Sequence, residues 1–472
     1  MAGTRRGPSA VEWLRRLKKK QISTVELVDL VVDHINRVNP ELNAMVCFND
    51  IEQLRVQGIA SDKQLETGMA KPLQGLPVTI KDSIDVQGLP STGGSLGREK
   101  YVPTKDATVV ARLRAAGAII VGKTNVPEYS SSYETDNALF GRTNNPFDLD
   151  RTPGGSSGGE AALLGADATI VGIGADGGGS IRVPSHYCGT VGLRPTVGRV
   201  PDTGHWPYTR DTGYRDMMCI GPMARHVEDL ALILPIIAGS DFVDPFAFDA
   251  GLESVNSVDI ADLNIGFYLY DGVVAVSSET QTAILNCIKY LEEAGASVFE
   301  ATPPDLNEAT SLFFSLIGAD GGQRTKDDIE TSGGEHHVQF QTLLDGFNES
   351  LSVTEFFDLQ RCFFDFRSNL RTFLSGFDAI VCPVTPGPAP LHMSPPFGFA
   401  PEAYYKYEAF NYVHAFAIAG APCTVVPVSE QDNLPIGVQV VSSPYQEHIS
   451  LFVAHQLEHL LSGSVPALGF GI

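Results

Sequence analysis

The sequence has little cysteine and no long apolar run, and both scarcities narrow the class of protein. Its 472 residues include 7 cysteines, scattered along the chain without a C-x-x-C pair. Such a set is typical of free thiols in a reducing compartment rather than of a disulfide framework. No stretch approaches the roughly 18 apolar residues of a membrane helix. The basic N-terminus also lacks the apolar segment of a signal peptide. We therefore expect a cytoplasmic protein that does not enter a membrane.

Positive charge is scarce as well. The chain has 33 lysines and arginines against 56 aspartates and glutamates, which gives a formal net charge of −23. Nucleic-acid binding depends on basic surface that displaces counterions. The composition therefore predicts no nucleic-acid partner and no attraction to anionic membranes, while 43% hydrophobic residues are ordinary for a soluble globular protein.

Short apolar runs alternate with helical stretches along most of the chain. This alternation predicts an α/β fold with one large domain and a mixed, mostly parallel central sheet covered by helices on both faces. The predicted strands are Val78–Ile80, Ala118–Val121, Ala168–Ile173, Ala379–Cys382, Thr424–Val428 and Ile436–Val441. Further helices are predicted at Thr108–Ala116 and Thr282–Ala294.

No repeat or linker divides the chain, so residues 1–472 are predicted to form a single domain in three parts. An N-terminal helical segment covers about 8–70 and contains a capping box at Ser23–Glu26, with Pro40 expected to end its helix. A catalytic core covers about 71–260. The C-terminal part contains an aromatic-rich region at about 305–416.

The aromatic-rich region is unusual in composition. Between Phe313 and Phe416 lie 15 of the 25 phenylalanines, together with Tyr404, Tyr405, Tyr407 and Tyr412. Aromatic side chains at helical spacing often form helix cores. They can equally line an apolar pocket for a bulky substrate, and the sequence leaves both interpretations open.

Three motifs suggest a cofactor or metal but lack the required context. Gly117–Thr124 fits a phosphate-binding loop, yet its interior Ala-Ile-Ile-Val resembles a buried strand. Gly172–Gly177 fits a dinucleotide fingerprint, but Pro184 follows too early for the required helix. His455 and His459 stand one helical turn apart without an evident third ligand, on what we expect to be a surface helix. We therefore expect no cofactor and no metal.

Three other features carry chemistry. Lys81 ends the apolar run Leu76–Ile80, where burial would lower the amine pKa and make it a general base, unless it is ion-paired. Ser156 and Ser157 have glycines on both sides, which leaves a substrate room to approach, although a flexible turn would look alike. Ser180 follows three glycines whose N–H groups could hold an oxyanion, and its hydroxyl is the natural nucleophile.

Taken together, these segments resemble the amidase-signature family over nearly the whole chain. The serines Ser156 and Ser180 stand 24 residues apart, as the family has them. Supporting similarities occur at 106–117, 122–128, 141–146 and 434–439.

The resemblance implies a mechanism without a cofactor. Ser180 would attack a carbonyl carbon while Ser156, after a cis peptide bond to Gly155, relays the proton to neutral Lys81. The oxyanion would be held by the N–H groups of Gly177, Gly178, Gly179 and Ser180. Ser157, Asp176 and Arg182 match positions that support the triad.

The chain departs from the family pattern at two positions. Ala175 replaces a usual threonine, and Gly177 replaces threonine or a larger residue. The missing threonine hydroxyl removes one hydrogen bond near Ser156, nominally ~1 kcal/mol. The additional glycine is expected to loosen the oxyanion loop and to alter selectivity.

Two other functions compete with this interpretation. An α/β-hydrolase would use Ser156 of G-x-S-x-G as nucleophile with a later histidine, but it needs a strand directly upstream. A glutamine amidase subunit of a tRNA-dependent amidotransferase belongs to the same family and would need partner subunits. A purely structural scaffold would need no buried lysine beside such serines. We expect an amidase for hydrophobic or aryl amides, with carbamates and esters as further substrates, and a homo-oligomer is possible.

Overall fold

The structure, a computed structural model, describes residues 7–209, 212–347, 349–398 and 407–461. Its centre is an eleven-stranded sheet in the order β1-β3-β2-β4-β6-β5-β10-β11-β9-β7-β8. The strands are β1 Met45–Phe48, β2 Pro77–Lys81, β3 Ile119–Thr124, β4 Val171–Asp176, β5 Val191–Arg194, β6 Cys219–Ala224, β7 Asn264–Phe267, β8 Ser297–Glu300, β9 Ala379–Pro383, β10 Cys423–Gln431 and β11 Leu434–Ser442.

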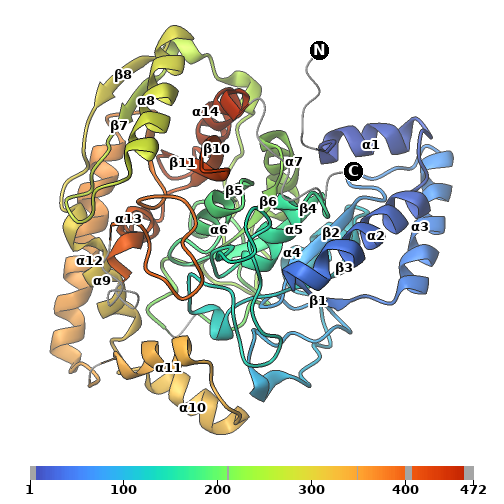
Figure 1. The fold of residues 1–472 in the computed structure, drawn as a ribbon, viewed down its shortest axis with the longest axis horizontal. Helices are drawn as coiled ribbons and strands as arrows, with labels where there is room; N and C mark the ends of the chain where they lie inside the picture. The colour runs from blue at the N-terminus through green and yellow to red at the C-terminus, as the bar shows by residue number, and fades with distance from the viewer. Residues whose placement is uncertain (1–6, 210–211, 348, 399–406, 462–472) are drawn as a thin grey trace.

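Helices flank this sheet (Figure 1). They are α1 Ala10–Lys18, α2 Thr24–Leu42, α3 Ile51–Glu66, α4 Thr108–Ala115, α5 Gly158–Gly165, α6 Arg182–Tyr187, α7 Val227–Ile237, α8 Ser278–Glu293, α9 Ala309–Ile317, α10 Gln323–Ser332, α11 Val338–Asp345, α12 Val353–Leu374, α13 Asn411–Ala419 and α14 Glu447–Glu458. The blue helices α1 to α3 lie at one end of the molecule, and α8 with β7 and β8 at the other. Among the described helices, none is long and apolar enough to span a bilayer.

The single α/β domain with a mixed sheet flanked by helices is confirmed, and each predicted strand and helix has a counterpart. The sheet is less parallel than expected. In the described chain, β2 pairs in parallel with β3 and β4, and β7 with β8 and β9, whereas the other six pairings are antiparallel. One reason is the hairpin between β10 and β11, whose turn residues Asp432 and Asn433 have positive φ.

The N-terminal segment differs from its prediction in two details. The capping box of α2 is present, with Ser23 and Glu26 bonded reciprocally. However, α2 passes through Pro40 and ends at Leu42, because a proline in the last turn removes only its own N–H bond. Asn43 caps it in the left-handed conformation. The segment is also not purely helical, since β1 lies between α2 and α3 and pairs with β3.

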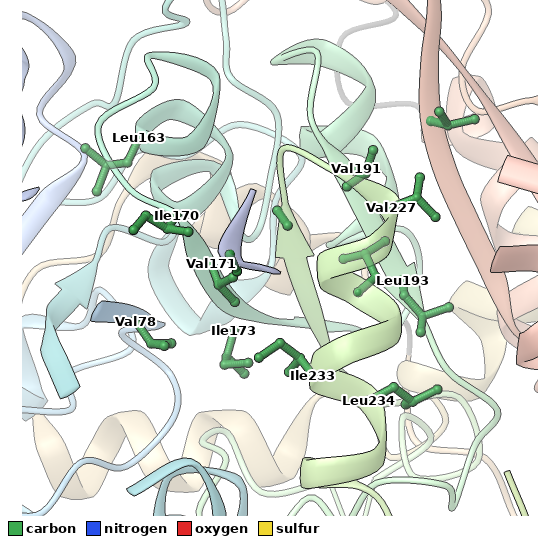
Figure 2. Packing of buried hydrophobic residues seen from close by; sticks show 14 of the residues in the cluster. Val78, Leu163, Ile170, Val171, Ile173, Val191, Leu193, Val227, Ile233 and Leu234 are labelled. Carbon is green, nitrogen blue, oxygen red and sulfur yellow. The ribbon is translucent and has the colours of Figure 1, made fainter. Parts of the chain in front are cut away.

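The main hydrophobic core packs the centre of the sheet against helices. Figure 2 shows Val171 and Ile173 of β4 facing Ile233 of α7, and all three side chains are fully buried. The same cluster extends from Ala10 to Leu457, so one core joins the N-terminal and C-terminal parts. At about 25 cal/mol per Å² of buried apolar surface, it provides the main stabilisation. It also holds the ends of β2 and β4 in place.

The three motifs that resemble cofactor or metal sites, at 117–124, 172–177 and 455–459, lie in ordinary strands and helices or next to them. Residues 119–124 form strand β3, as the apolar interior predicts, and 172–176 belong to β4. The prediction of a surface helix at the C-terminus was wrong, because α14 packs most of its residues into the core. His455 and His459 lie with ring centroids 5.7 Å apart. Within the described residues, no three histidine, cysteine or acidic side chains gather as a metal site.

Candidate active site

The chemically distinctive residues meet at one edge of the sheet. Lys81 is the last residue of β2 and Asp176 the last residue of β4. These strands are parallel neighbours, so their carboxyl ends lie at the same edge. The glycine loop that leads into α6 begins at this edge, directly after β4, and Ser156 of the glycine–serine segment that leads into α5 contacts Lys81 there.

Lys81 lies beside Ser156 in a buried position. The Lys81 Nζ atom is 2.6 Å from Ser156 Oγ and donates to the carbonyl oxygen of Ala175 at 3.3 Å. Burial lowers the pKa of Lys81 to about 7, although the negative charge of Asp176 opposes the shift. At neutral pH a large fraction of this amine is therefore uncharged and able to accept a proton. The peptide bond between Gly155 and Ser156 is cis, as the family resemblance implies.

A second buried lysine has a different environment. Lys123 on β3 donates to Ser91 Oγ at 2.8 Å and to the carbonyl oxygen of Asp82 at 3.1 Å. The Asp82 carboxylate lies 3.6 Å from its Nζ atom. Lys123 is thus an ion-paired structural lysine, whereas Lys81 faces a serine hydroxyl.

Ser180 lies at the end of the glycine loop and faces the same cavity as Ser156. The two serine segments are joined, because the Ser157 N–H donates to the Ser180 carbonyl oxygen at 3.0 Å. The Ser157 hydroxyl contacts the Ala175 carbonyl oxygen at 3.3 Å. In the described chain no histidine hydrogen-bonds to Ser156 or Ser180, and no strand immediately precedes Ser156. An α/β-hydrolase elbow is therefore absent there.

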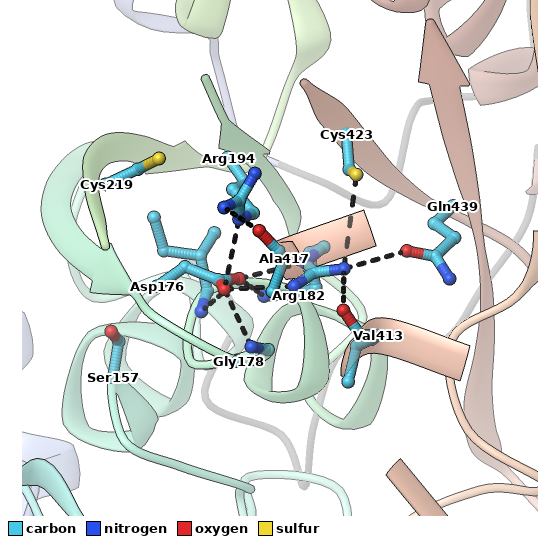
Figure 3. A network of polar contacts seen from close by, with 12 residues as sticks. Ser157, Asp176, Gly178, Arg182, Arg194, Cys219, Val413, Ala417, Cys423 and Gln439 are labelled. Atoms are coloured by element: carbon cyan, nitrogen blue, oxygen red, sulfur yellow. Dashed lines mark hydrogen bonds and ion pairs between the residues drawn. The ribbon is translucent and has the colours of Figure 1, made fainter. Parts of the chain in front are cut away.

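Asp176 and Arg182 form the polar centre of the site (Figure 3). The Asp176 carboxylate accepts from Arg182 Nε and Nη2, each at 3.0 Å, and Arg194 Nε lies 3.6 Å away. Burial opposes the charge, but the two guanidinium groups hold the pKa of Asp176 well below its usual range. Arg182 also donates to the carbonyl oxygen of Val413 at 2.9 Å and to Gln439. Thus α6 and β4 are tied to the C-terminal half.

The four predicted oxyanion donors are not equivalent. The Gly179 N–H donates to Asp176 Oδ1 at 2.7 Å, so it is committed to the carboxylate. The N–H groups of Gly177, Gly178 and Ser180 have no protein acceptor among the described residues, and all three residues line the cavity. Of the four predicted donors, the Gly179 N–H is therefore bonded elsewhere, and an oxyanion role for the other three stays a prediction. Gly179 instead allows the loop to turn, because its φ of +125° is a conformation that residues with a side chain rarely adopt.

The cavity beside the serines has a volume of about 820 Å³, and twelve aromatic residues contribute to its wall. The aromatic residues that line it are Tyr129, Tyr133, Tyr208, Tyr214, Phe313, Phe314, Phe340, Phe347, Phe356, Phe363, Phe364 and Tyr407. The aromatic-rich region supplies rings to the core as well as to the cavity, since Phe366, Tyr412 and Phe416 belong to a buried core cluster. A role of the cavity in binding a bulky substrate stays a prediction. Tyr404 and Tyr405 lie outside the described residues.

Aromatic rings occupy the space that the glycine loop leaves open. A Cβ atom built on Gly178 would lie 2.5 Å from Phe313 Cζ, and one on Gly177 would lie 3.0 Å from Tyr214 Cδ1. The absence of a side chain at Gly177 is therefore matched by the Tyr214 ring. The sequence indicated Phe313 only as part of the aromatic-rich region and did not indicate Tyr133 or Tyr214, because nothing local connects positions 133 and 214 to the serines.

Comparison with known proteins agrees with this geometry. The family model described as Amidase matches residues 26–451. The chain is 32% identical to the glutamyl-tRNA(Gln) amidotransferase A-subunit of Carboxydothermus hydrogenoformans, over 95% of this chain and 96% of that protein. It is 29% identical to human fatty-acid amide hydrolase 2, over 97% and 90%. The structure of a bacterial aryl acylamidase of the amidase-signature family superposes with a TM-score of 0.83 at 26% identity, covering 96% of each chain.

The fold and site define a hydrolase of carbon–nitrogen bonds in amides. More particularly, the chain belongs to the amidase family, also called the amidase-signature family.

Proposed function

We propose that Ser180 is the nucleophile, Ser156 the bridging proton carrier and Lys81 the base of an amide hydrolase. The observation that carries this proposal is the 2.6 Å contact of the buried Lys81 with Ser156, and burial also lowers the pKa of Lys81 to about 7. Ser180 Oγ attacks the carbonyl carbon while its proton passes to Ser156, and the Ser156 proton passes to Lys81. The carbonyl oxygen becomes the oxyanion of a tetrahedral intermediate.

Collapse of that intermediate breaks the C–N bond. The proton held by Lys81 returns through Ser156 to the leaving nitrogen, which departs as a neutral amine. Water then attacks the acyl-enzyme by the same proton path and releases the acid. The N–H groups of Gly177, Gly178 and Ser180 face the developing negative charge, and one such donor is worth about 2.7–4 kcal/mol.

For the substrate, we propose hydrophobic or aryl amides. Phe313 and Tyr214 stand directly against the glycines next to Ser180, so an apolar acyl or aryl group would bury its surface there. The relatives include a fatty-acid amide hydrolase and an aryl acylamidase by name. Carbamates and esters present the same carbonyl carbon to Ser180 and are further proposed substrates.

The test compares a matched aryl amide, aryl carbamate and aryl ester with acetamide and glutamine. We expect the wild type to cleave the aryl amide or carbamate and the Ser180→Ala variant to cleave none. Lys81→Ala should be equally inactive. Activity that survives Ser180→Ala would reject the assigned nucleophile. Preference for acetamide or glutamine over the aryl amide would reject the substrate class.

A second candidate is a glutamine amidase subunit that supplies ammonia to a tRNA-dependent amidotransferase. Its support is the 32% identity to one amidotransferase A-subunit and the 33% identity to two further A-subunits of this kind. The curated relatives thus favour this candidate over the aryl amidase, whereas the aromatic wall favours the latter. Copurification of stoichiometric partner subunits from the native host, or hydrolysis of glutamine in preference to aryl amides, would decide for it.

A further inference from the structure

The glycine loop has no side chains of its own between Asp176 and Ser180. Glycines populate many backbone conformations, so a peptide unit here could flip unless it is held from outside. The Tyr133 hydroxyl donates to the Gly178 carbonyl oxygen at 2.5 Å. We propose that Tyr133, held in turn by His414, is a positioning residue that fixes the oxyanion donors on either side of this peptide unit. The inference rests on the proposed function.

Both ends of one peptide unit are restrained. Its carbonyl group, from Gly178, accepts from Tyr133, while its N–H group, from Gly179, donates to Asp176 at 2.7 Å. The units before and after it carry the N–H groups of Gly178 and Ser180, two residues that line the cavity. Holding this unit restrains ψ of Gly178 and φ of Gly179, the two torsions that join it to the units with the flanking donors. The clamp therefore fixes donors that the glycines alone would leave free to rotate.

The number of protons on each group determines the direction of the hydrogen bonds that link Tyr133, His414 and Thr310. The Tyr133 hydroxyl has one proton, which goes to Gly178, so it must accept from His414 Nε2 at 2.7 Å. His414 Nδ1 then accepts from Thr310 Oγ1 at 2.9 Å. The single proton of the Thr310 hydroxyl has two acceptors at 2.9 Å, His414 Nδ1 and Asn411 Oδ1. We assign it to His414, because Asn411 Oδ1 already accepts the Thr310 N–H at 3.0 Å, whereas the Nδ1 atom of a neutral ring protonated on Nε2 has no other donor. His414 is thereby a neutral imidazole protonated on Nε2.

Burial and packing keep this chain in place. His414 is fully buried, and burial lowers its pKa to about 3, so it stays neutral over the working pH range. Its ring stacks on Phe313 with centroids 4.3 Å apart. The Tyr133 ring stacks on Phe410 at 3.7 Å. Neither polar ring can swing away without breaking an aromatic contact. The chain ends at Asn411, which donates to Asp271 at 2.9 Å.

Removal of the Tyr133 hydroxyl tests the clamp, because Tyr133→Phe keeps the stacked ring. We expect kcat on an aryl amide to fall about 10–100-fold, since oxyanion donors act in the transition state, with KM changed less than about threefold. The matched control is Tyr412→Phe, which also deletes a buried hydroxyl that donates to a backbone carbonyl, that of Val274 at 2.6 Å. The control should lose stability but keep kcat.

A trifluoromethyl ketone with the same aryl group separates positioning from pocket shape. Ser180 adds to its carbonyl carbon, the proton passes to Lys81, and the oxygen becomes an anion in the oxyanion hole. We expect Tyr133→Phe to weaken this adduct by the same factor as kcat/KM. Substrate affinity should be equal in Ser180→Ala and in the double variant with Tyr133→Phe. Equal losses in adduct and substrate affinity would reduce Tyr133 to a pocket wall and overturn the inference.

His414 tests the relay by rescue. Gln can donate to Tyr133 and accept from Thr310, whereas Leu can do neither, so His414→Gln should retain several-fold more kcat than His414→Leu at equal folded fraction. Equal kcat in these two variants, or unchanged kcat in Tyr133→Phe, would contradict the clamp. If the ketone forms no adduct with the wild type, the proposed function itself fails and the clamp loses its purpose. If the wild type forms the adduct and Tyr133→Phe forms it with the same affinity, only the clamp is rejected and the proposed function stands.

Discussion

The Asp176 carboxylate accepts two hydrogen bonds of 3.0 Å each from the Arg182 side chain, and both residues are fully buried. Such a buried ion pair is costly to form but more costly to break, because one charge is then left without compensation. The same carboxylate accepts the Gly179 N–H. We therefore expect both the stability of the fold and the shape of the glycine loop to depend on this one side chain.

We expect Asp176→Asn to lower the free energy of unfolding by about 3–5 kcal/mol, because Arg182 and Arg194 would keep their charges without a partner. Activity should fall even where the variant remains folded. Urea denaturation measures the first effect and turnover of an aryl amide the second. Asp148→Asn is the control, since its ion pair with Arg151 is partly exposed and should contribute about 1 kcal/mol or less. Equal losses in both variants would contradict the central role of Asp176.

The pKa of Lys81, about 7, predicts the pH dependence of the proposed reaction. Only the uncharged amine can accept the Ser156 proton, so kcat/KM should rise tenfold per pH unit below 7 and level off above 8. Lys81→Met should be inactive at every pH. A profile that is flat from pH 5.5 to 9 would exclude a lysine base with this pKa.

Glu160 offers a stability test of the same buried region. Its carboxyl group is fully buried on α5 and accepts from Thr79 Oγ1 at 2.6 Å. Burial raises its pKa to about 8 from 4.5. The folded state therefore binds more protons than the unfolded state between these values, and stability is lost as pH rises through 8.

Glu160→Gln keeps an oxygen for Thr79 and cannot ionise. We expect the variant to be more stable than the wild type by about 1–3 kcal/mol at pH 9 and nearly equal to it at pH 5. Thermal or urea unfolding at both pH values measures this. The rising limb of the pH profile of kcat/KM near pH 7 should persist in this variant, because it reflects the deprotonation of Lys81. Its disappearance in Glu160→Gln would assign that limb to the glutamate instead.

The parts of the fold that could be predicted are those with a local signal. Apolar runs bounded by glycines marked β2, β3, β9, β10 and β11 to within a few residues. β1 was missed because Met45–Phe48 is short and lies between two strong helices. The C-terminal α14 was expected at the surface as a helix near the end of the chain, although most of its residues are buried. Whether two strands pair in parallel or antiparallel depends on the connections between them, which the pattern of apolar runs does not indicate.

The site divides in the same way. Lys81, Ser156 and Ser180 stand in motifs of fixed spacing, so the family resemblance placed them, and the contact of Lys81 with Ser156 agrees with it. Tyr133 and His414 are 281 residues apart in sequence and meet only in the folded chain. The commitment of the Gly179 N–H could not be predicted either, because it depends on the peptide orientation and not on residue type.

The glycine loop provides a last test, in which two neighbouring glycines should respond differently to the same added methyl group. Gly179 has φ of +125°, and a Cβ atom there would lie 2.7 Å from Val413 Cγ2. Gly177 does not have a positive φ, and the nearest atom to its Cβ would be Tyr214 Cδ1 at 3.0 Å, on the edge of a side-chain ring.

We therefore expect Gly179→Ala to lose about 1–3 kcal/mol of stability, because it combines backbone strain with a steric clash. It should also lose at least about 100-fold in kcat, since the flanking donors move with it. Gly177→Ala should stay within about fivefold in kcat and change KM instead, as Tyr214 shifts in the pocket wall. Parallel kinetics of the two variants on one aryl amide make the comparison. Indistinguishable kcat values would mean that the loop tolerates movement at both positions, and that Asp176 and Tyr133 do not set its conformation.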